Sequence, residues 1–106
     1  MSVAVLSPAA RRDLIAAVRW LAPDNPAAAR ALRDAVANAA ERIGEHIHIG
    51  NQRPELADER YRFVSLTGFP YLIAYNADRL PPLIVRILHG ARDVPEALRD
   101  SDGSRG

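Results

Sequence analysis

A dense polar cluster follows an apolar run near the C-terminal end of this chain. The run Leu83–Leu88 leads into His89-Gly90-Ala91-Arg92-Asp93. A histidine can act as a general base or a hydrogen-bond partner, and an arginine can bind a carboxylate or a phosphate. Strand ends often carry the working residues of α+β proteins. We expect His89 to pack and form hydrogen bonds rather than act as a general base, and Arg92 is the strongest candidate for contact with another molecule.

Other polar groups are weaker candidates for chemistry. His46 and His48 flank Ile47, but no third ligand follows nearby, so we expect surface histidines and no metal site. Asp58 and Glu59 are adjacent, and neighbours on an extended chain point to opposite faces, which argues against a shared proton. No Ser/His/Asp motif, glycine-rich phosphate loop or Walker pattern occurs. Taken by themselves, the residues therefore indicate neither an enzyme nor a cofactor.

Length and composition predict one domain. A chain of 106 residues can bury a single modest core, and we assign residues 1–100 to the domain and 101–106 to a flexible tail. No apolar run approaches the roughly 20 residues that span a bilayer, and no signal peptide is evident, so a cytoplasmic protein without a membrane partner is expected. A net charge of +1 is too low for a general polyanion binder.

The absence of two residue types limits the chemistry further. Cysteine is absent, which excludes thiol catalysis and disulfides. All fourteen basic residues are arginines, so a lysine Schiff base is also excluded. Every cation on the chain therefore has a planar guanidinium, which suits carboxylates and phosphates.

The first half of the chain predicts a short strand and a helix. Val3–Leu6 is apolar, and Ser7-Pro8 supplies the N-cap residue and the proline that begin helices. We expect this helix to end at Leu21. At 100° per residue, its core-facing stripe consists of Leu14, Val18 and Leu21. Trp20 lies about 120° from Leu14, so it faces either the next helix or the outside.

A second helix is predicted from Ala27 to about Glu45. Asp24 or Asn25 can cap it, and Pro26 fits its first turn. Apolar residues recur at spacings of three and four: Ala28, Leu32, Ala35, Val36, Ala39 and Ile43. The short connection between the helices predicts an antiparallel helical hairpin.

Three β-type runs follow the helices. They are Arg60–Leu66, Tyr71–Asn76 and Leu83–His89, and a turn at residues 67–70 joins the first two into a hairpin. The predicted fold is α+β with the order β-α-α-β-β-β: an N-terminal strand, a helical hairpin on one face of an antiparallel sheet, a three-stranded meander and a short C-terminal helix at 94–99. Since an isolated buried arginine is costly, we expect Arg62 and Arg86 to lie on the open face.

These features in this order resemble the RelE/ParE toxin superfamily, and its ParE branch in particular, from about Val3 to Leu98. The supporting stretches are Leu6-Ser7-Pro8-Ala9-Ala10 with Asp13-Leu14, Asp24-Asn25-Pro26-Ala27-Ala28-Ala29, Arg53-Pro54-Glu55-Leu56, Tyr71-Leu72-Ile73-Ala74-Tyr75 and Val85-Arg86-Ile87-Leu88-His89-Gly90-Ala91-Arg92-Asp93.

The resemblance implies a toxin of a bacterial type II toxin–antitoxin system that acts on DNA gyrase. A ParD-type antitoxin would hold it inactive, and the toxin would reach operator DNA only through that antitoxin. On this reading, the candidates for contact with gyrase are Arg62, Arg86, His89 and Arg92. The candidates for contact with the antitoxin are Trp20, Tyr71, Tyr75 and Arg92. For Arg92, a structural salt bridge to Asp93 or Glu96 is the alternative.

The same resemblance leaves a second activity open, since RelE-type toxins cleave mRNA on the ribosome. Cleavage by the RNA's own 2′-OH needs a base, an acid and cations at the phosphate. Arg62 and Arg92 match two basic positions of that set. Tyr71 replaces an expected arginine, and Leu98 replaces an expected tyrosine, so gyrase inhibition is favoured. An inactive member that only binds its antitoxin is a third possibility.

Overall fold

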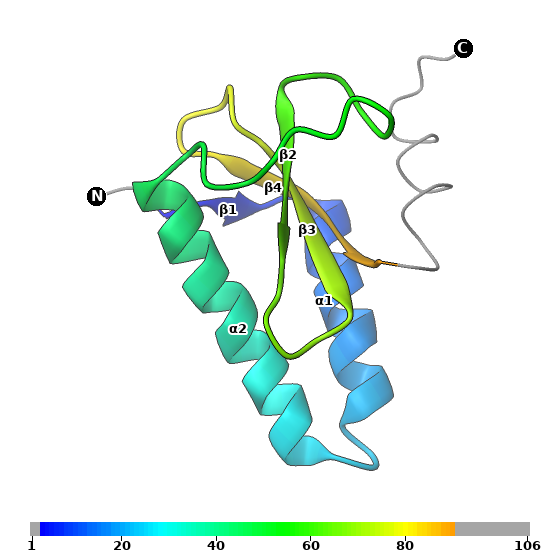
Figure 1. The fold of residues 1–106 in the computed structure, drawn as a ribbon. Helices are drawn as coiled ribbons and strands as arrows, with labels where there is room; N and C mark the ends of the chain where they lie inside the picture. The colour runs from blue at the N-terminus through cyan, green and yellow to red at the C-terminus, as the bar shows by residue number, and fades with distance from the viewer. Residues whose placement is uncertain (1–2, 91–106) are drawn as a thin grey trace.

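Two helices cover one face of a four-stranded sheet in a computed structural model that describes residues 3–90 (Figure 1). The elements follow the predicted order: β1 (Val5–Leu6), α1 (Pro8–Leu21), α2 (Pro26–Glu45), β2 (Tyr61–Ser65), β3 (Tyr71–Asn76) and β4 (Leu83–His89). The predicted C-terminal helix, the tail and Arg92 lie outside the described residues. No described helix is long and apolar enough to cross a membrane.

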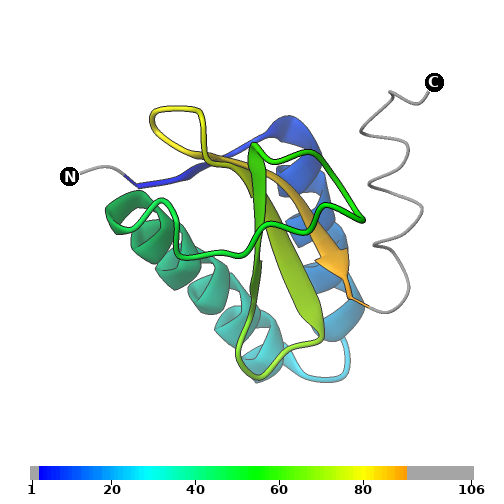
Figure 2. The same ribbon diagram turned by 45° about the horizontal axis from the view of Figure 1, so that its top comes forward.

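Both helices begin within one residue of the predicted position, after a capping side chain. The Oγ of Ser7 accepts a hydrogen bond from the Ala10 amide at 3.0 Å, and the Oδ1 of Asn25 accepts one from the Ala28 amide at 3.0 Å. Each cap satisfies an amide that has no partner within its helix. A proline follows each cap, so α2 begins at Pro26, one residue earlier than expected. The short turn between the helices folds them side by side (Figure 2).

The predicted α+β fold and its antiparallel meander are confirmed, but the sheet as a whole is mixed rather than antiparallel. Its strand order is β1-β4-β3-β2, and β1 runs parallel to β4, while the other neighbours are antiparallel. The helical hairpin, β2 and β3 lie between β1 and β4 in sequence, so that β4 returns in the direction of β1. The Val5 amide donates to the carbonyl of Pro82 at 3.0 Å, and the Ser7 amide donates to that of Ile84 at 2.9 Å.

Side chains pack on both faces of the sheet. The larger cluster lies between the helices and the sheet and includes Leu32, Val36, Ile43, Ile73, Tyr75 and Ile84. On the opposite face, Ala57 packs with Phe63, Ala74 and Leu88. Ala57 belongs to the segment between α2 and β2, so this segment covers part of the face that the sequence analysis left open.

Candidate functional site

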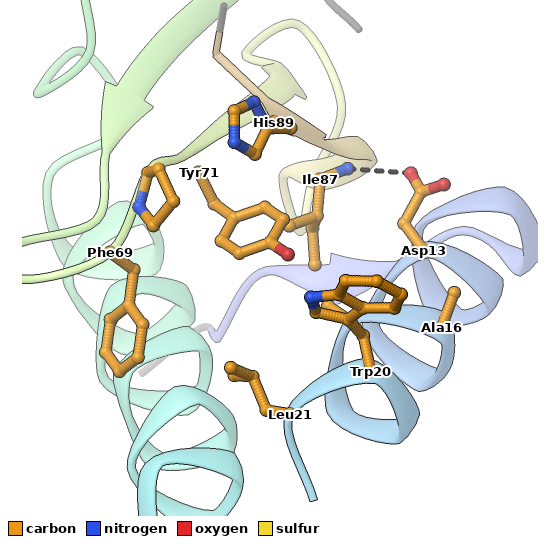
Figure 3. Close-up of a pocket in the computed structure, with 10 residues that line it drawn as sticks. Asp13, Ala16, Trp20, Leu21, Phe69, Tyr71, Ile87 and His89 are labelled. Atoms are coloured by element: carbon orange, nitrogen blue, oxygen red, sulfur yellow. Dashed lines mark hydrogen bonds between the residues drawn. The ribbon is translucent and has the colours of Figure 1, made fainter. Parts of the chain in front are cut away.

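A pocket of about 470 Å³ opens between the second half of α1 and the adjoining ends of β3 and β4 (Figure 3). We call it the α1 groove. Its lining is mostly apolar and aromatic and consists of Asp13, Ala16, Ala17, Trp20, Leu21, Phe69, Pro70, Tyr71, Ile87 and His89. The volume is within the range of pockets that hold ligands, roughly 300–1,000 Å³.

The helical wall of the α1 groove combines small residues with one large exposed side chain. Ala16 and Ala17 lie one turn before Trp20, so nothing bulky fills the space beside the indole. Trp20 is 81% exposed, although it is one of the most apolar surface residues of the chain. The prediction that it faces the next helix or the outside is therefore resolved in favour of the outside.

The opposite wall comes from the β2–β3 hairpin and from β4. Phe69 and Pro70 belong to the turn, which Gly68 permits by adopting a φ of 86°. Tyr71 begins β3 and meets His89 edge to face, with ring centroids 5.8 Å apart. Figure 3 shows Trp20 and Leu21 facing the side chains of Phe69 and Tyr71.

Asp13 lies at one end of the α1 groove and joins α1 to the outer edge of β4. Its Oδ2 accepts hydrogen bonds from the Ile87 amide at 2.9 Å and from Arg86 Nε at 2.8 Å, and its Oδ1 accepts one from Arg86 Nη2 at 3.0 Å. The pair is largely withdrawn from water, with 26% of the Arg86 side chain and 17% of the Asp13 side chain exposed. The carboxylate therefore compensates the charge of Arg86 and satisfies an edge amide of β4.

A second polar arrangement lies at the other end of β3, beneath the exit of α2. The hydroxyl of Tyr75 accepts a hydrogen bond from the Gly50 amide at 2.9 Å and donates one to the Ile47 carbonyl at 2.8 Å. Arg62 Nη1 donates to the carbonyl of Gly50 at 2.7 Å. Burial raises the pKa of the Tyr75 phenol above its usual value, while the Gly50 hydrogen bond and the Arg62 charge act in the opposite direction. These bonds hold the segment 46–51 against the sheet.

Two of the predicted contact residues lie elsewhere than expected. Tyr75 is fully buried, so it belongs to the core and offers no surface to an antitoxin. Arg62 pairs across the ladder with Tyr75, so it lies on the helical face rather than the open one. Its guanidinium avoids burial because it reaches the carbonyls of the segment 46–51 at the edge of the sheet.

Other predicted residues do come together. Trp20, Tyr71 and His89 all line the α1 groove, and Arg86 adjoins it through Asp13. Sequence reasoning did not identify Phe69 or Asp13 as residues of the site. Asp13 is the single acidic residue of α1 and lies on the same helical face as Ala17 and Trp20. This position could have identified it as a residue of the site. Phe69 gave a weaker signal, as an aromatic residue in a glycine-containing turn.

The remaining polar candidates form no catalytic cluster within residues 3–90. His46 and His48 are exposed, and no group of three potential metal ligands occurs in this part of the chain. Asp58 pairs with Arg60 rather than with Glu59, with 3.0 Å between Oδ2 and Nη2. The hydrogen bond from Arg60 lowers the pKa of the Asp58 carboxyl, so this group is held in its charged form.

Two comparisons with known proteins match this chain to toxins. The sequence profile of the family described as "ParE toxin of type II toxin-antitoxin system, parDE" matches residues 4–94. The chain is also 33% identical over 84 residues to the Toxin RelE3 of Caulobacter vibrioides, an alignment that covers 79% of this chain and 89% of that protein.

Proposed function

This chain belongs to the ParE toxin family of type II toxin–antitoxin systems, and we propose that it acts by inhibiting DNA gyrase without being an enzyme itself. Inhibition of gyrase blocks replication, and a ParD-type antitoxin would neutralise the toxin. Because the proposed target is DNA gyrase, we expect the toxin to act in the cytoplasm. Membership of the toxin family already implies an antitoxin partner, so only the target and the mechanism are proposed.

The proposal rests on one observation: Arg62 and Arg86, the arginines of β2 and β4, form hydrogen bonds within the protein itself. Arg86 is held by the carboxylate of Asp13, and Arg62 donates to the carbonyl of Gly50. A ribonuclease needs cations directed at the scissile phosphate, together with a base and an acid. Guanidinium groups that already stabilise the fold are poorly placed to stabilise a phosphorane, which supports a protein-contact mechanism.

Tyr71 adds a second, independent argument. It stands where the ribonuclease relatives are expected to have an arginine, and its ring packs against His89 at the wall of the α1 groove. The aromatic ring adds apolar contact area and no positive charge. Leu98, which replaces the expected tyrosine in the sequence, has no group that can transfer a proton.

One observation favours the alternative of a ribosome-dependent mRNA endoribonuclease. The relative from Caulobacter vibrioides is named Toxin RelE3, a name that it shares with the RelE-type toxins. The two activities require different features of the chain. Gyrase inhibition requires a surface that fits a protein, and mRNA cleavage requires a set of groups that fits RNA. They can therefore be compared in a single experiment.

The test compares gyrase inhibition with mRNA cleavage for the same purified toxin. We expect the wild-type protein to inhibit DNA supercoiling and to increase gyrase-dependent DNA cleavage, and a ParD-type antitoxin to restore supercoiling. We expect no cleavage of ribosome-bound mRNA. Arg92→Ala should weaken the inhibition, whereas Arg30→Ala, at an exposed position on α2, should not.

Each other outcome identifies a competing function. Cleavage of ribosome-bound mRNA at defined positions, with supercoiling unaffected, would overturn the proposal in favour of the endoribonuclease. If the wild-type toxin shows neither activity but still binds its antitoxin, it is an inactive member of the family that serves only as an antitoxin-binding module.

A further inference from the structure

The outer face of α1 carries three arginines around one isoleucine. At about 100° per residue, Arg11, Arg12, Ile15 and Arg19 fall on one side of the helix, turned away from the core. All four side chains are exposed, and Ile15 is 46% exposed. We call this surface the α1 basic face. It is separate from the α1 groove, whose lining includes none of these four residues.

The charges of the α1 basic face have no acidic partner among residues 3–90. The ion pairs in this part of the chain involve Arg53, Arg60 and Arg86. Asp13 is the one acidic residue of α1, and its carboxylate is engaged by Arg86 and the Ile87 amide on the side of β4. The α1 basic face therefore presents uncompensated positive charge, which attracts a polyanion.

The spacing of the arginines fits the backbone of duplex DNA. From Arg11 to Arg19 the axis of α1 rises by about 12 Å, which is close to the width of the major groove, roughly 12 Å. Guanidinium groups at the two ends of the face can therefore reach phosphates on both sides of that groove. Between them, Ala16 is small and lets a backbone approach closely. Contacts of this kind position a protein on DNA without reading its sequence.

Two other anionic surfaces fit the α1 basic face less well. A helix that lies on a lipid surface turns its apolar side to the lipid, and the apolar side chains of α1, Leu14, Val18 and Leu21, pack against the core instead. Duplex RNA has a deep and narrow major groove that side chains do not reach. Duplex DNA is therefore the occupant that the charge and the spacing favour.

We propose that the α1 basic face binds the phosphate backbone of the duplex DNA that gyrase holds, so that the toxin contacts the enzyme and its DNA in one complex. The proposal rests on the proposed function, because gyrase brings the DNA to the toxin. Few phosphate contacts give weak binding by themselves, in keeping with the net charge of +1. Attachment to gyrase raises the effective concentration of DNA beside the face, so weak contacts then stabilise the complex.

DNA binding in the absence of gyrase tests the α1 basic face directly. The probe is a fluorescently labelled duplex of about 20 base pairs and mixed sequence, titrated with the purified toxin between about 50 and 200 mM salt while its anisotropy is recorded. We expect log Kd to rise with log salt concentration with a slope of about 3, because each phosphate contact contributes about 0.9.

Charge reversal distinguishes this face from net charge. Arg11→Glu combined with Arg19→Glu should raise the Kd at least about tenfold at the lowest salt and reduce the slope by about 2. The matched control combines Arg30→Glu with Arg33→Glu, which changes the net charge equally at exposed positions of α2 and should raise the Kd less than about threefold. Arg11→Lys combined with Arg19→Lys keeps the charge and should bind DNA within about twofold of wild type.

A gyrase assay then connects the contact with the proposed function. The Arg11→Glu and Arg19→Glu double variant should require at least about fivefold more toxin than wild type for the same gyrase-dependent DNA cleavage, and the α2 control should match wild type. Circular dichroism of each variant confirms that the fold is retained.

Other outcomes would overturn the proposal. Equal losses of DNA binding in the α1 and α2 double variants would show that only net charge matters. Absence of binding to the duplex, or tighter binding to RNA of the same length or to phosphatidylglycerol vesicles, would exclude DNA as the occupant. Unchanged gyrase-dependent cleavage by the α1 double variant would exclude a role for the contact in the gyrase complex. A toxin that binds duplex DNA through α1 without inhibiting gyrase would overturn the proposed target instead.

Discussion

Tyr71 and Tyr75 lie on the same strand and point to the same face of the sheet, yet their surroundings are opposite. Tyr75 is fully buried, and its hydroxyl forms two hydrogen bonds with the segment 46–51. Tyr71 lies four residues earlier, where it forms part of the wall of the α1 groove and its hydroxyl has no hydrogen bond within residues 3–90. The β3 strand therefore joins two regions: one fixes the fold, and the other is left open for a partner.

The difference shows how one sheet face can serve both stability and recognition. The chain after α2 folds back over Tyr75, and Gly50 allows this close approach. Near Tyr71, small residues of α1 leave the space unfilled. Buried polar groups contribute to stability only when their hydrogen bonds are complete, whereas an exposed aromatic ring contributes little until a partner covers it. Substitutions at the two ends of β3 should therefore affect different properties.

The largest effect on stability is expected from Gly50→Ala. A Cβ at this position would lie 2.9 Å from the Phe63 carbonyl oxygen and 2.9 Å from Tyr75 Cε1. Because backbone and a packed ring cannot move aside cheaply, we expect the free energy of unfolding to fall by about 2–3 kcal/mol. Urea denaturation measures this change. Gly90→Ala is the matched control, since its nearest neighbour is 3.9 Å away, and equal losses for both variants would refute the role of close packing.

A smaller loss is expected from Tyr75→Phe, which removes one hydroxyl and keeps the ring. The Gly50 amide and the Ile47 carbonyl would both lose a partner in a buried place, which costs about 1–2 kcal/mol in the free energy of unfolding. The same change at the other end of the strand, Tyr71→Phe, should cost less than about 0.5 kcal/mol. If both substitutions cost the same by urea denaturation, the contrast between the two tyrosines is incorrect.

Alkaline pH should produce a further effect that depends on Tyr75. Its folded-state pKa is raised above the usual value of 10.0, chiefly by burial, so the folded protein favours the neutral phenol. Below pH 10 the phenol is neutral in both states and the full stability is present. As the pH rises from about 10 toward the folded-state pKa, the unfolded chain ionises first, and stability falls. Stability measured between pH 9 and 11 should decline less in Tyr75→Phe than in wild type, and parallel curves would contradict this.

The smallest effect on stability is expected from Trp20→Ala. The side chain is 81% exposed, so its removal should change the free energy of unfolding by less than about 0.5 kcal/mol. Thermal and urea unfolding give the measurement. A change this small would place Trp20 in the region left open for a partner, in contrast to the buried Tyr75. A loss above about 1 kcal/mol would make Trp20 a structural residue instead.

Local sequence patterns predicted most of the elements. Ser7 was recognisable as a cap, and so was Asn25 as one of two candidates with Asp24. The spacing of apolar residues placed both helices within about one residue of their observed ends. The limits of β3 and β4 also agree with the predicted runs. These features depend on neighbours in sequence, because capping and periodicity act over three or four residues. For that reason they could be read before the fold was known.

Long-range partners could not be predicted in the same way. The bond from the Ile87 amide to Asp13 joins residues 74 positions apart, and the pairing of β1 with β4 closes a similar distance. The cost of burying a charge suggested the open face for Arg62, yet it lies on the helical face, the same face as Val64. The carbonyl of Gly50, which solves this problem for Arg62, comes from a segment predicted only as a loop.

The sequence by itself determined the element order, the caps, the all-arginine set of cations and the resemblance to a toxin family, because these depend on residue type and local spacing. Tertiary structure decided which of two similar tyrosines became core and which became surface. It also decided that Asp13 compensates Arg86 and that Trp20 stands beside a hollow. Such outcomes depend on which distant segments the packing brings within a few ångströms, where burial and hydrogen bonding give each side chain its role.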